Sequence, residues 1–346
     1  MKFSIQLSAD YPDKSYGGDR VYQDMLDQAV LADQLGFDAV SITEHHLMNC
    51  LMMPAPLLFA VKIAAMTKQI KIMTSIVVLP LHDMRTYAGE LVVADIFTEG
   101  RLMLGVGRGA FRYEMERLGV PMQETQGRFN ESLDVLQALL TEENVSWDGE
   151  YYQFDELTIM PRPVRAGGPQ MMMAVMNPEG IYHCTKRGFH IQTTPLSGNH
   201  QLLLDQVAGF RRAKDEMGAQ GDELTLTLSR VGHVAKTAAE RERKVEAAHR
   251  YYGRFDNVFT GPGLVDNGMV RALPCATPLN ELGESLLICT PDEMVDKLAP
   301  YAELGIDRVI LNVNFGLEAQ ETLDAIQCFA EEVMPHFTTK TAASAA

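Results

Sequence analysis

The sequence lacks the features that mark several classes of protein. No cluster of lysines and arginines occurs, and the formal net charge is −16 at pH 7. This excludes a nucleic-acid partner, because binding a phosphate backbone requires clustered cations. No apolar run is long enough to cross a bilayer. The first residues contain no apolar signal segment with a cleavage site, so we expect no export and no membrane partner. The sequence therefore predicts a cytoplasmic protein.

Cysteines are few and scattered. The five cysteines form no C-x-x-C pair, which suits reduced thiols better than disulfides or a zinc site. Nucleophile-elbow and P-loop patterns are also absent. The twenty methionines are expected mainly to fill irregular gaps in the core.

Predicted strands and helices alternate along the chain. Eight strands with helices between them, over 346 residues, favour one (β/α)8 TIM-type barrel of the α/β class. Two doubly wound domains are the alternative, but no linker-like change in composition divides the chain. The predicted strands span 3–7, 39–43, 70–79, 102–106, 170–175, 190–194, 224–234 and 308–313. The predicted helices span 22–35, 55–66, 86–97, 128–140, a segment near Ile181, 202–217, 238–252, 291–304 and 317–333.

Three segments depart from this alternation within a barrel domain predicted over 1–337. Residues 142–168 are rich in aromatic residues and proline, and are expected to form an insertion after the fourth barrel unit. Glycines and prolines interrupt any regular element in 255–287. A loop of that length inside a compact domain is usually functional or mobile, which predicts a mobile lid. The small, polar residues of 338–346 are expected to form a flexible tail.

The candidate chemistry begins where the second predicted strand ends, at Glu44-His45-His46. Carboxyl ends of barrel strands are where such folds place their reactive groups. Adjacent histidines on a strand point to opposite faces, so only one of them should face a pocket. Glu44 could orient an imidazole and raise its basicity. A metal site is not predicted, because the other histidines are poorly placed as ligands. A hydrogen-bonded structural histidine is the alternative.

A second pattern, G-x-G-x-x-[GA], runs over 105–110. A dinucleotide-binding fold would require an acidic residue at the end of the next strand about 20 residues on, and the next predicted strand begins only at residue 170. The Rossmann interpretation therefore fails. What remains is a glycine-rich strand end where the backbone and Arg108 can approach an anion. A tight turn with a surface arginine is the alternative.

Several stretches together resemble the bacterial luciferase-like, flavin-dependent monooxygenase family, and most closely the luciferase α subunit. They are 37–40 with Glu44-His45-His46, 74–80, 100–102, 105–109 and 333–335, and they match in order from Lys2 to Phe337. The family fold is an eight-stranded β/α barrel. The resemblance implies a two-component enzyme in which reduced FMN binds at the carboxyl end of the barrel. There, O₂ forms a flavin hydroperoxide that oxygenates a small organic substrate. A separate NAD(P)H:flavin reductase would supply the reduced FMN, since the chain shows no nicotinamide fingerprint.

The resemblance also implies roles for particular residues. His45 corresponds to the catalytic histidine, and a non-proline cis peptide is expected between Ser75 and Ile76, against the flavin ring. Phosphate contacts map to Arg108, to Arg128 and to the backbone of Val175 and Met176. The helices at 55–66 and 86–97 would form the seam of a homodimer. The glycine-rich part of the cofactor site comprises Gly107, Arg108, Gly109 and Ala110.

Two departures from the luciferase pattern limit these expectations. Gly107 stands where luciferase has a cysteine, which is expected to open space beside the flavin and to alter the substrate. Val175 and Met176 replace a polar pair, which leaves phosphate binding there to backbone amides. Two other functions stay open: a deazaflavin-dependent oxidoreductase, and a flavin-binding relative without catalysis. Neither the substrate nor the nucleophilic or electrophilic character of the peroxide follows from the sequence.

Overall fold

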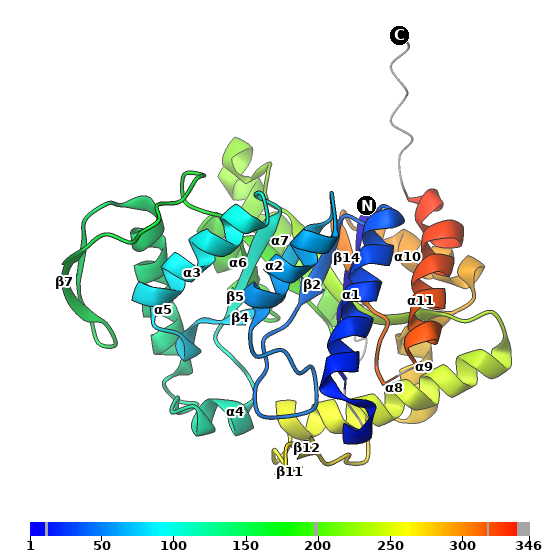
Figure 1. Cartoon of the computed structure of the whole chain (residues 1–346). Helices are drawn as coiled ribbons and strands as arrows, with labels where there is room; N and C mark the ends of the chain where they lie inside the picture. The colour runs from blue at the N-terminus through cyan, green and yellow to red at the C-terminus, as the bar shows by residue number, and fades with distance from the viewer. Residues whose placement is uncertain (11–12, 197–199, 317, 338–346) are drawn as a thin grey trace.

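Eight parallel strands form a closed barrel in the computed structural model, which describes residues 1–10, 13–196, 200–316 and 318–337. Each strand pairs with its neighbours, and β14 returns to β1 with Arg308 opposite Lys2. The predicted barrel is thus confirmed (Figure 1). The barrel strands are β1 (Lys2–Gln6), β2 (Ala39–Ile42), β3 (Lys71–Thr74), β5 (Leu102–Gly107), β8 (Gln170–Ala174), β9 (His190–Thr193), β10 (Leu226–Val234) and β14 (Arg308–Asn312).

Helices surround the barrel, and most of them share one buried apolar cluster with the strands. Local signals set their starts: Asp83 caps α3 through the Arg85 amide, and Thr290 and Glu293 form a capping box on α10. The helices are α1 (Gly18–Gln34), α2 (Pro56–Met66), α3 (Met84–Phe97), α4 (Arg112–Arg117), α5 (Thr125–Thr141), α6 (Pro178–Lys186), α7 (His200–Met217), α8 (Ala238–Phe259), α9 (Leu279–Ser285), α10 (Pro291–Glu303) and α11 (Ala319–Cys328). The sequence missed α4. Its last predicted helix began at residue 317, which lies outside the described residues, as does the predicted tail.

The inside of the barrel changes from apolar to polar along the strands. One buried cluster contains Met73, Met103, Met172 and Ile310, so these methionines do fill the core. Side chains on a strand return to the same face every second residue. Two positions after Met73 and Ile310 come Ser75 and Asn312, which line a cavity. The polar end is therefore the carboxyl end of the barrel.

The third predicted strand is shorter than expected. β3 ends at Thr74, and the chain resumes pairing with β5 only at β4 (Val77–Val78). At the end of β3, the Thr74 hydroxyl accepts a hydrogen bond from the Gly105 amide of β5 and donates one to the Gly105 carbonyl, at 2.8 and 2.9 Å. A Cβ on Gly105 would stand 2.1 Å from the Thr74 carbonyl oxygen. Glycine at this position therefore permits the close approach of the two strands.

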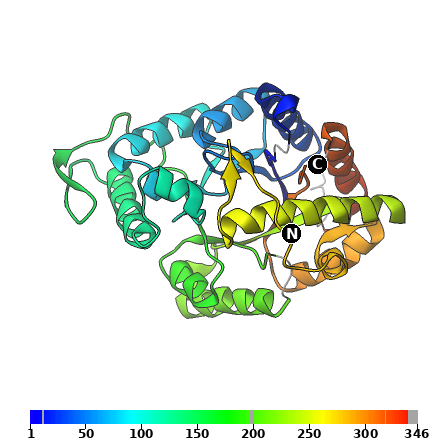
Figure 2. The ribbon, with the colours of Figure 1, turned by 90° about the horizontal axis from the view of Figure 1, so that it is seen from below.

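The segment predicted as an irregular lid, 255–287, contains regular structure. Helix α8 continues to Phe259 and lies across the carboxyl end of the barrel (Figure 2). A hairpin of β11 (Val265–Asp266) and β12 (Met269–Val270) follows, then α9 and β13 (Leu287–Cys289), which pairs with β10. The Asn257 side chain closes the turn through Leu264. Asn49, which follows β2, accepts a hydrogen bond from the Val270 amide through its side-chain oxygen, at 2.7 Å. Such side-chain bonds to backbone were not visible as a pattern in the sequence.

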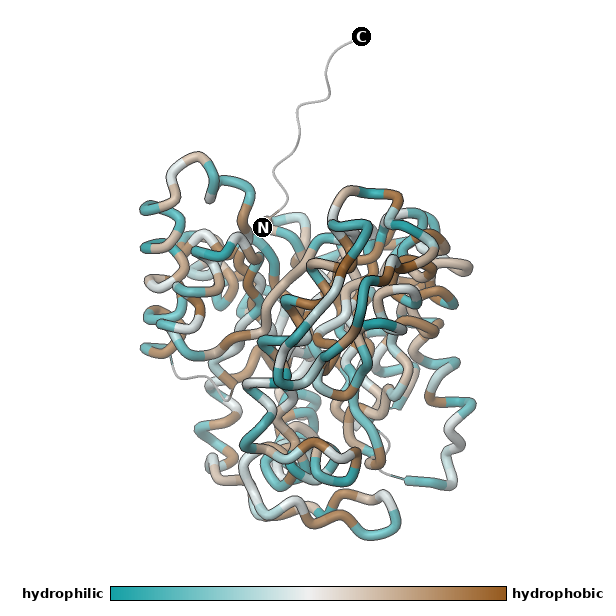
Figure 3. Tube along the Cα trace, turned by 90° about the vertical axis from the view of Figure 1, so that its left-hand side faces the viewer, coloured by the Kyte–Doolittle hydropathy of each residue, from teal (hydrophilic) through white to brown (hydrophobic). Residues whose placement is uncertain are grey.

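Residues 142–168 leave the barrel, as expected of an insertion. They form an antiparallel hairpin of β6 (Val145–Asp148) and β7 (Gln153–Leu157), which projects beside α5 (Figure 1). Among the described residues, no helix is long and apolar enough to cross a membrane. Hydrophobic residues instead occur in short stretches along the chain (Figure 3).

Candidate active site

A cavity of about 970 Å³ opens at the carboxyl end of the barrel. This volume is at the upper end of the range for small-molecule and cofactor sites, roughly 300–1,000 Å³. Residues from all eight barrel strands or the turns that follow them line it, and α8 contributes Tyr251, Tyr252, Phe255 and Phe259. Long segments far apart in the sequence thus converge on one site.

The floor of the cavity is polar and incompletely paired. The Gln192 amide nitrogen donates to the hydroxyl oxygens of Ser75 and Ser229, at 2.5 and 3.1 Å. Gln192 Oε1 and Asn312 Oδ1 are buried and have no hydrogen-bond partner among the described residues. Buried polar atoms normally find partners. These two acceptors, on residues that line the cavity, are therefore available to a bound molecule.

His45 stands at the wall of this cavity with its ring held from two sides. Its Nδ1 lies 2.9 Å from Oε1 of Glu114, whose side chain is fully buried on α4. The other oxygen of Glu114 accepts from the His46 backbone amide at 2.7 Å. The imidazole also stacks on Phe111, with ring centroids 4.2 Å apart. Donation from Nδ1 to Glu114 leaves Nε2 as the ring nitrogen available to a bound molecule.

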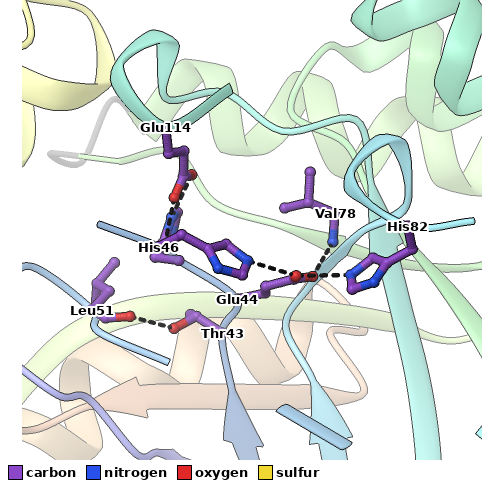
Figure 4. A network of polar contacts seen from close by, with 8 residues as sticks. Thr43, Glu44, His46, Leu51, Val78, His82 and Glu114 are labelled. Carbon is purple, nitrogen blue, oxygen red and sulfur yellow. Dashed lines mark hydrogen bonds and ion pairs between the residues drawn. The ribbon is translucent and has the colours of Figure 1, made fainter. Parts of the chain in front are cut away.

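His46 and His82 share a different carboxylate, Glu44 (Figure 4). His46 Nε2 and His82 Nε2 lie 2.9 and 2.8 Å from Glu44 Oε1, and the Val78 amide donates to Oε2 at 2.7 Å. Because a carboxylate only accepts hydrogen bonds, both imidazoles present an Nε2 proton to it. Glu44 thereby joins the turn after β2 to β4 and to the turn before α3.

These contacts shift the pKa values of Glu44 and His46. Burial acts to raise the pKa of Glu44, but the hydrogen bonds from His46, His82 and the Val78 amide together lower it from 4.5 to about 2. The hydrogen bond to Glu44 raises the pKa of His46 above 6.5, and burial opposes this. Glu44 is therefore an anion at neutral pH.

Glu44 does orient an imidazole and raise its basicity, but the imidazole is that of His46. Although Glu44 and His45 are adjacent in sequence, Glu44 contacts His46 and His82, and the partner of His45 is Glu114. Glu114 is 69 residues further along the chain, in a helix that the sequence did not predict. The expectation that only one of the two histidines faces the pocket is met, since His45 lines it and His46 does not.

Most of the other predicted site residues line the cavity. They are Ser75, Ile76, Gly107, Arg108, Gly109, Ala110, Val175 and Met176. The Ser75–Ile76 peptide bond is cis, as expected. Arg128 is absent from the lining; it pairs with Glu124 at 2.8 Å and lies over the Tyr151 ring. Arg187, which follows α6, lines the cavity and was not foreseen.

Gly107 does not open space beside a ligand. A Cβ on this residue would lie 2.7 Å from Cδ1 of Ile76. The Ile76 side chain therefore fills the volume that the missing side chain leaves. An exposed rim residue, Arg108, follows directly, and no described carboxylate forms an ion pair with it.

An aromatic wall faces His45. Phe111 meets Phe255 and Phe259 edge-on, at 5.8 and 6.2 Å between centroids, and the latter two stack on each other. Leu51 and Val231 extend the apolar surface into the cavity. Such a wall excludes water and accommodates an apolar molecule.

The model of the luciferase-like monooxygenase family matches residues 1–308. This chain belongs to the luciferase-like monooxygenase family, which confirms the family resemblance seen in the sequence.

Individual relatives extend over nearly the whole chain. The oxygenase component of flavin-dependent trigonelline monooxygenase from Acinetobacter baylyi is 25% identical, over 98% of this chain and 96% of its own. The structure of monooxygenase RslO1 from Streptomyces bottropensis has a TM-score of 0.85 at 23% identity and covers 98% and 100% of the two chains. The oxygenating constituent of 3,6-diketocamphane monooxygenase from Pseudomonas putida, solved with FMN, has a TM-score of 0.76 at 18% identity, with 98% and 99% covered. At these identities the two structures show a shared fold.

The relatives do not share one cofactor. The F420-dependent glucose-6-phosphate dehydrogenase from Beutenbergia cavernae is 26% identical over 90% of this chain and 93% of its own. Membership of the family therefore does not determine the cofactor of this chain.

Replacing the Glu44 carboxylate tests the charge network. A folded-state pKa of about 2, below the ordinary 4.5, means that the ionised form stabilises the fold above pH 4.5, and that this contribution is lost as the pH falls towards 2. We expect the Glu44→Gln variant to be less stable than the wild type near neutral pH. The difference in free energy of unfolding should shrink from about pH 4.5 downwards, as measured by urea denaturation across this range.

The control is Glu303→Gln at the exposed end of α10. The difference in free energy of unfolding between this variant and the wild type should not change with pH. If the difference for Glu44→Gln were equally independent of pH, the charge network around Glu44 would be contradicted.

Proposed function

We propose that this chain is the oxygenase component of a two-component, FMN-dependent monooxygenase that oxygenates a small organic substrate. The observation that carries the proposal is a cavity in which His45, held by Glu114, lies beside an aromatic wall and a rim arginine, Arg108, that has no ion pair among the described residues. The trigonelline relative is named as a flavin-dependent oxygenase component, and the diketocamphane structure contains FMN. Both support the same cofactor and organisation here.

The residues of the cavity fit a flavin nucleotide. The buried acceptors Gln192 Oε1 and Asn312 Oδ1 have no donor among the described residues, and a flavin ring carries N–H donors on its polar edge. Ile76 offers an apolar surface next to them. Arg108 has no ion-pair partner among the described residues, and a guanidinium suits a phosphate dianion. Arg128 would first have to leave Glu124 to take part.

Reduced FMN, when bound, supplies the electrons with which O₂ is activated. The chain itself contributes positioning, proton handling and exclusion of water. His45 can hold or move a proton at Nε2, because Glu114 fixes the other ring nitrogen. Phe111, Phe255 and Phe259 keep solvent from the same space. Because the chain shows no nicotinamide-binding pattern, a separate NAD(P)H:flavin reductase would supply the reduced cofactor.

An F420-dependent oxidoreductase that moves a hydride and does not use O₂ is the second candidate, since the Beutenbergia relative is of that kind. The two are separated by anaerobic titration with reduced FMN and, in parallel, with reduced F420, followed by a pulse of oxygen. We expect tight binding of reduced FMN, then oxygen consumption with an oxidised-flavin spectrum that develops slowly. Binding of F420 alone, with no change on oxygenation, would overturn the proposal.

Loss of the His45 imidazole should separate catalysis from folding. We expect His45→Ala to keep the fold and the FMN affinity, while turnover falls by roughly 10²–10⁴-fold, the usual contribution of a general acid or base. Oxygen consumption coupled to product is measured for the variant and for His336→Ala, an exposed histidine remote from the cavity. Normal turnover by His45→Ala would make this histidine a structural residue.

Arg108 should recognise the phosphate of the cofactor. Charge-assisted hydrogen bonds are worth about 1.5–3 kcal/mol each, so Arg108→Ala should weaken FMN by roughly ten- to a hundredfold. Riboflavin, which lacks the phosphate, should bind the variant almost as it binds the wild type. Fluorescence titration with both ligands measures this, and Arg128→Ala reports whether the second arginine contributes. Equal losses for FMN and riboflavin would remove Arg108 from the phosphate site.

The proposed assembly is a homodimer through α2 and α3. These neighbouring helices expose large apolar side chains that a partner could cover, with Leu58 74% and Phe97 63% exposed. We expect the wild type to scatter light with the mass of two chains, and the double variant Leu58→Asp/Phe97→Asp with the mass of one. Leu279→Asp, at an exposed leucine of α9, should leave the dimer intact. A wild-type mass of one chain at micromolar concentration would contradict the proposal.

A further inference from the structure

Arg230 is a buried cation at the edge of the active-site cavity. It lies on β10, is 6% exposed, and lines the cavity together with Val231 and Tyr252. Burial raises the pKa of Tyr252 to about 12, although the nearby guanidinium of Arg230 acts in the opposite direction. The phenol therefore stays neutral beside the charge and offers it no counterion.

The guanidinium is only partly satisfied by the protein. Its Nη2 donates to the backbone carbonyl of Ser285, and its Nε has no partner among the described residues. Two other largely buried arginines do have counterions, because Arg254 pairs with Asp10 and Arg308 with Asp38. No ion pair of Arg230 is found in the described parts of the chain.

A buried charge without a counterion is costly, since desolvation is not repaid. For a guanidinium beside a ligand cavity, this unfavourable desolvation is offset when the bound ligand carries an anionic group. Planar carboxylates match its geometry, and charge-assisted hydrogen bonds to them are strong. The surface next to Arg230, formed by Val231, Tyr252 and Phe255, is apolar and aromatic. The complementary ligand has an apolar ring and an acidic end.

The position of Arg230 separates it from the proposed phosphate site. Arg108 follows β5, while Arg230 belongs to β10, and strands β8 and β9 stand between them in the barrel. Arg108 is exposed at the rim, whereas Arg230 is buried. Arg187 also lines the cavity, but it pairs with Asp134. Arg108 and Arg230 are thus the two lining arginines without an ion pair among the described residues, and their different places suit two different anions.

We propose that Arg230 binds a carboxylate of the substrate, so that this enzyme acts on small ring-containing carboxylic acids. The inference rests on the proposed function, since it assigns the substrate class of the same site. The cofactor is the other possible source of an anion near Arg230, and the experiment below distinguishes the two.

The test uses benzoate as the probe and benzamide as its neutral counterpart, titrated calorimetrically into the full chain with and without FMN. We expect the wild type to bind benzoate more tightly than benzamide. Arg230→Gln should weaken benzoate by about tenfold or more, since a charge-assisted hydrogen bond is lost, and should leave benzamide and FMN unchanged. Arg230→Lys, which retains the charge, should keep part of the preference for benzoate.

The matched control is Arg241→Gln. Arg241 also donates to backbone carbonyls of the α9–β13 segment, at Gly283 and Ile288, but it does not line the cavity. This variant should bind benzoate as the wild type does. Equal binding of benzoate by wild type and Arg230→Gln, or no preference for benzoate in the wild type, overturns the inference. The inference is also overturned if Arg230→Gln loses affinity for FMN alone, which would assign Arg230 to the cofactor. Failure of FMN to bind or to react with oxygen would defeat the proposed function instead, because the benzoate titration without FMN is independent of it.

Discussion

Two buried carboxylates organise the mouth of this barrel, and the reactive part of the site depends on them. Glu114 fixes the His45 ring and the backbone of His46, while Glu44 holds the His46 and His82 rings and the end of β4. More than one donor contacts each carboxylate, and for Glu44 these hydrogen bonds lower the pKa to about 2. By holding Nδ1, Glu114 in turn leaves Nε2 of His45 for the cavity. The cavity-lining His45 is thus positioned by Glu114 of α4 and by Phe111, directly before that helix.

The remaining surfaces of the cavity differ in what they can bind. Its floor carries buried acceptors without a partner in the described parts of the chain, its rim carries an exposed arginine, and another side has an aromatic wall with the buried Arg230. Helix α8 supplies much of that wall and is tied down through Asn257, with the following hairpin bonded to Asn49. The order of these surfaces around one cavity suits a flavin nucleotide beside a small substrate, from which the aromatic residues exclude water.

Local patterns were sufficient for the barrel and for the strand ends that carry chemistry. Alternation of strands and helices predicted the eight strands, and the Glu44-His45-His46 and glycine-rich segments do reach the cavity. Contacts between distant segments were not predictable in this way. Nothing in the sequence linked His45 to Glu114, and proximity in the chain suggested Glu44 instead. The regular structure within 255–287 depends on side-chain to backbone bonds such as those of Asn257, which leave no periodic signal.

The central claim, that Glu114 orients His45 for proton handling, can be tested on the histidine itself. Nitrogen-15 NMR of histidine-labelled protein at mildly alkaline pH reports which ring nitrogen carries the proton. With wild-type protein we expect the His45 signal, assigned by its loss in His45→Ala, to show a protonated Nδ1 and a free Nε2. In Glu114→Gln this preference should be weakened, because the charged acceptor is gone. A wild-type His45 with its proton on Nε2, or a tautomer unchanged in Glu114→Gln, would contradict the account.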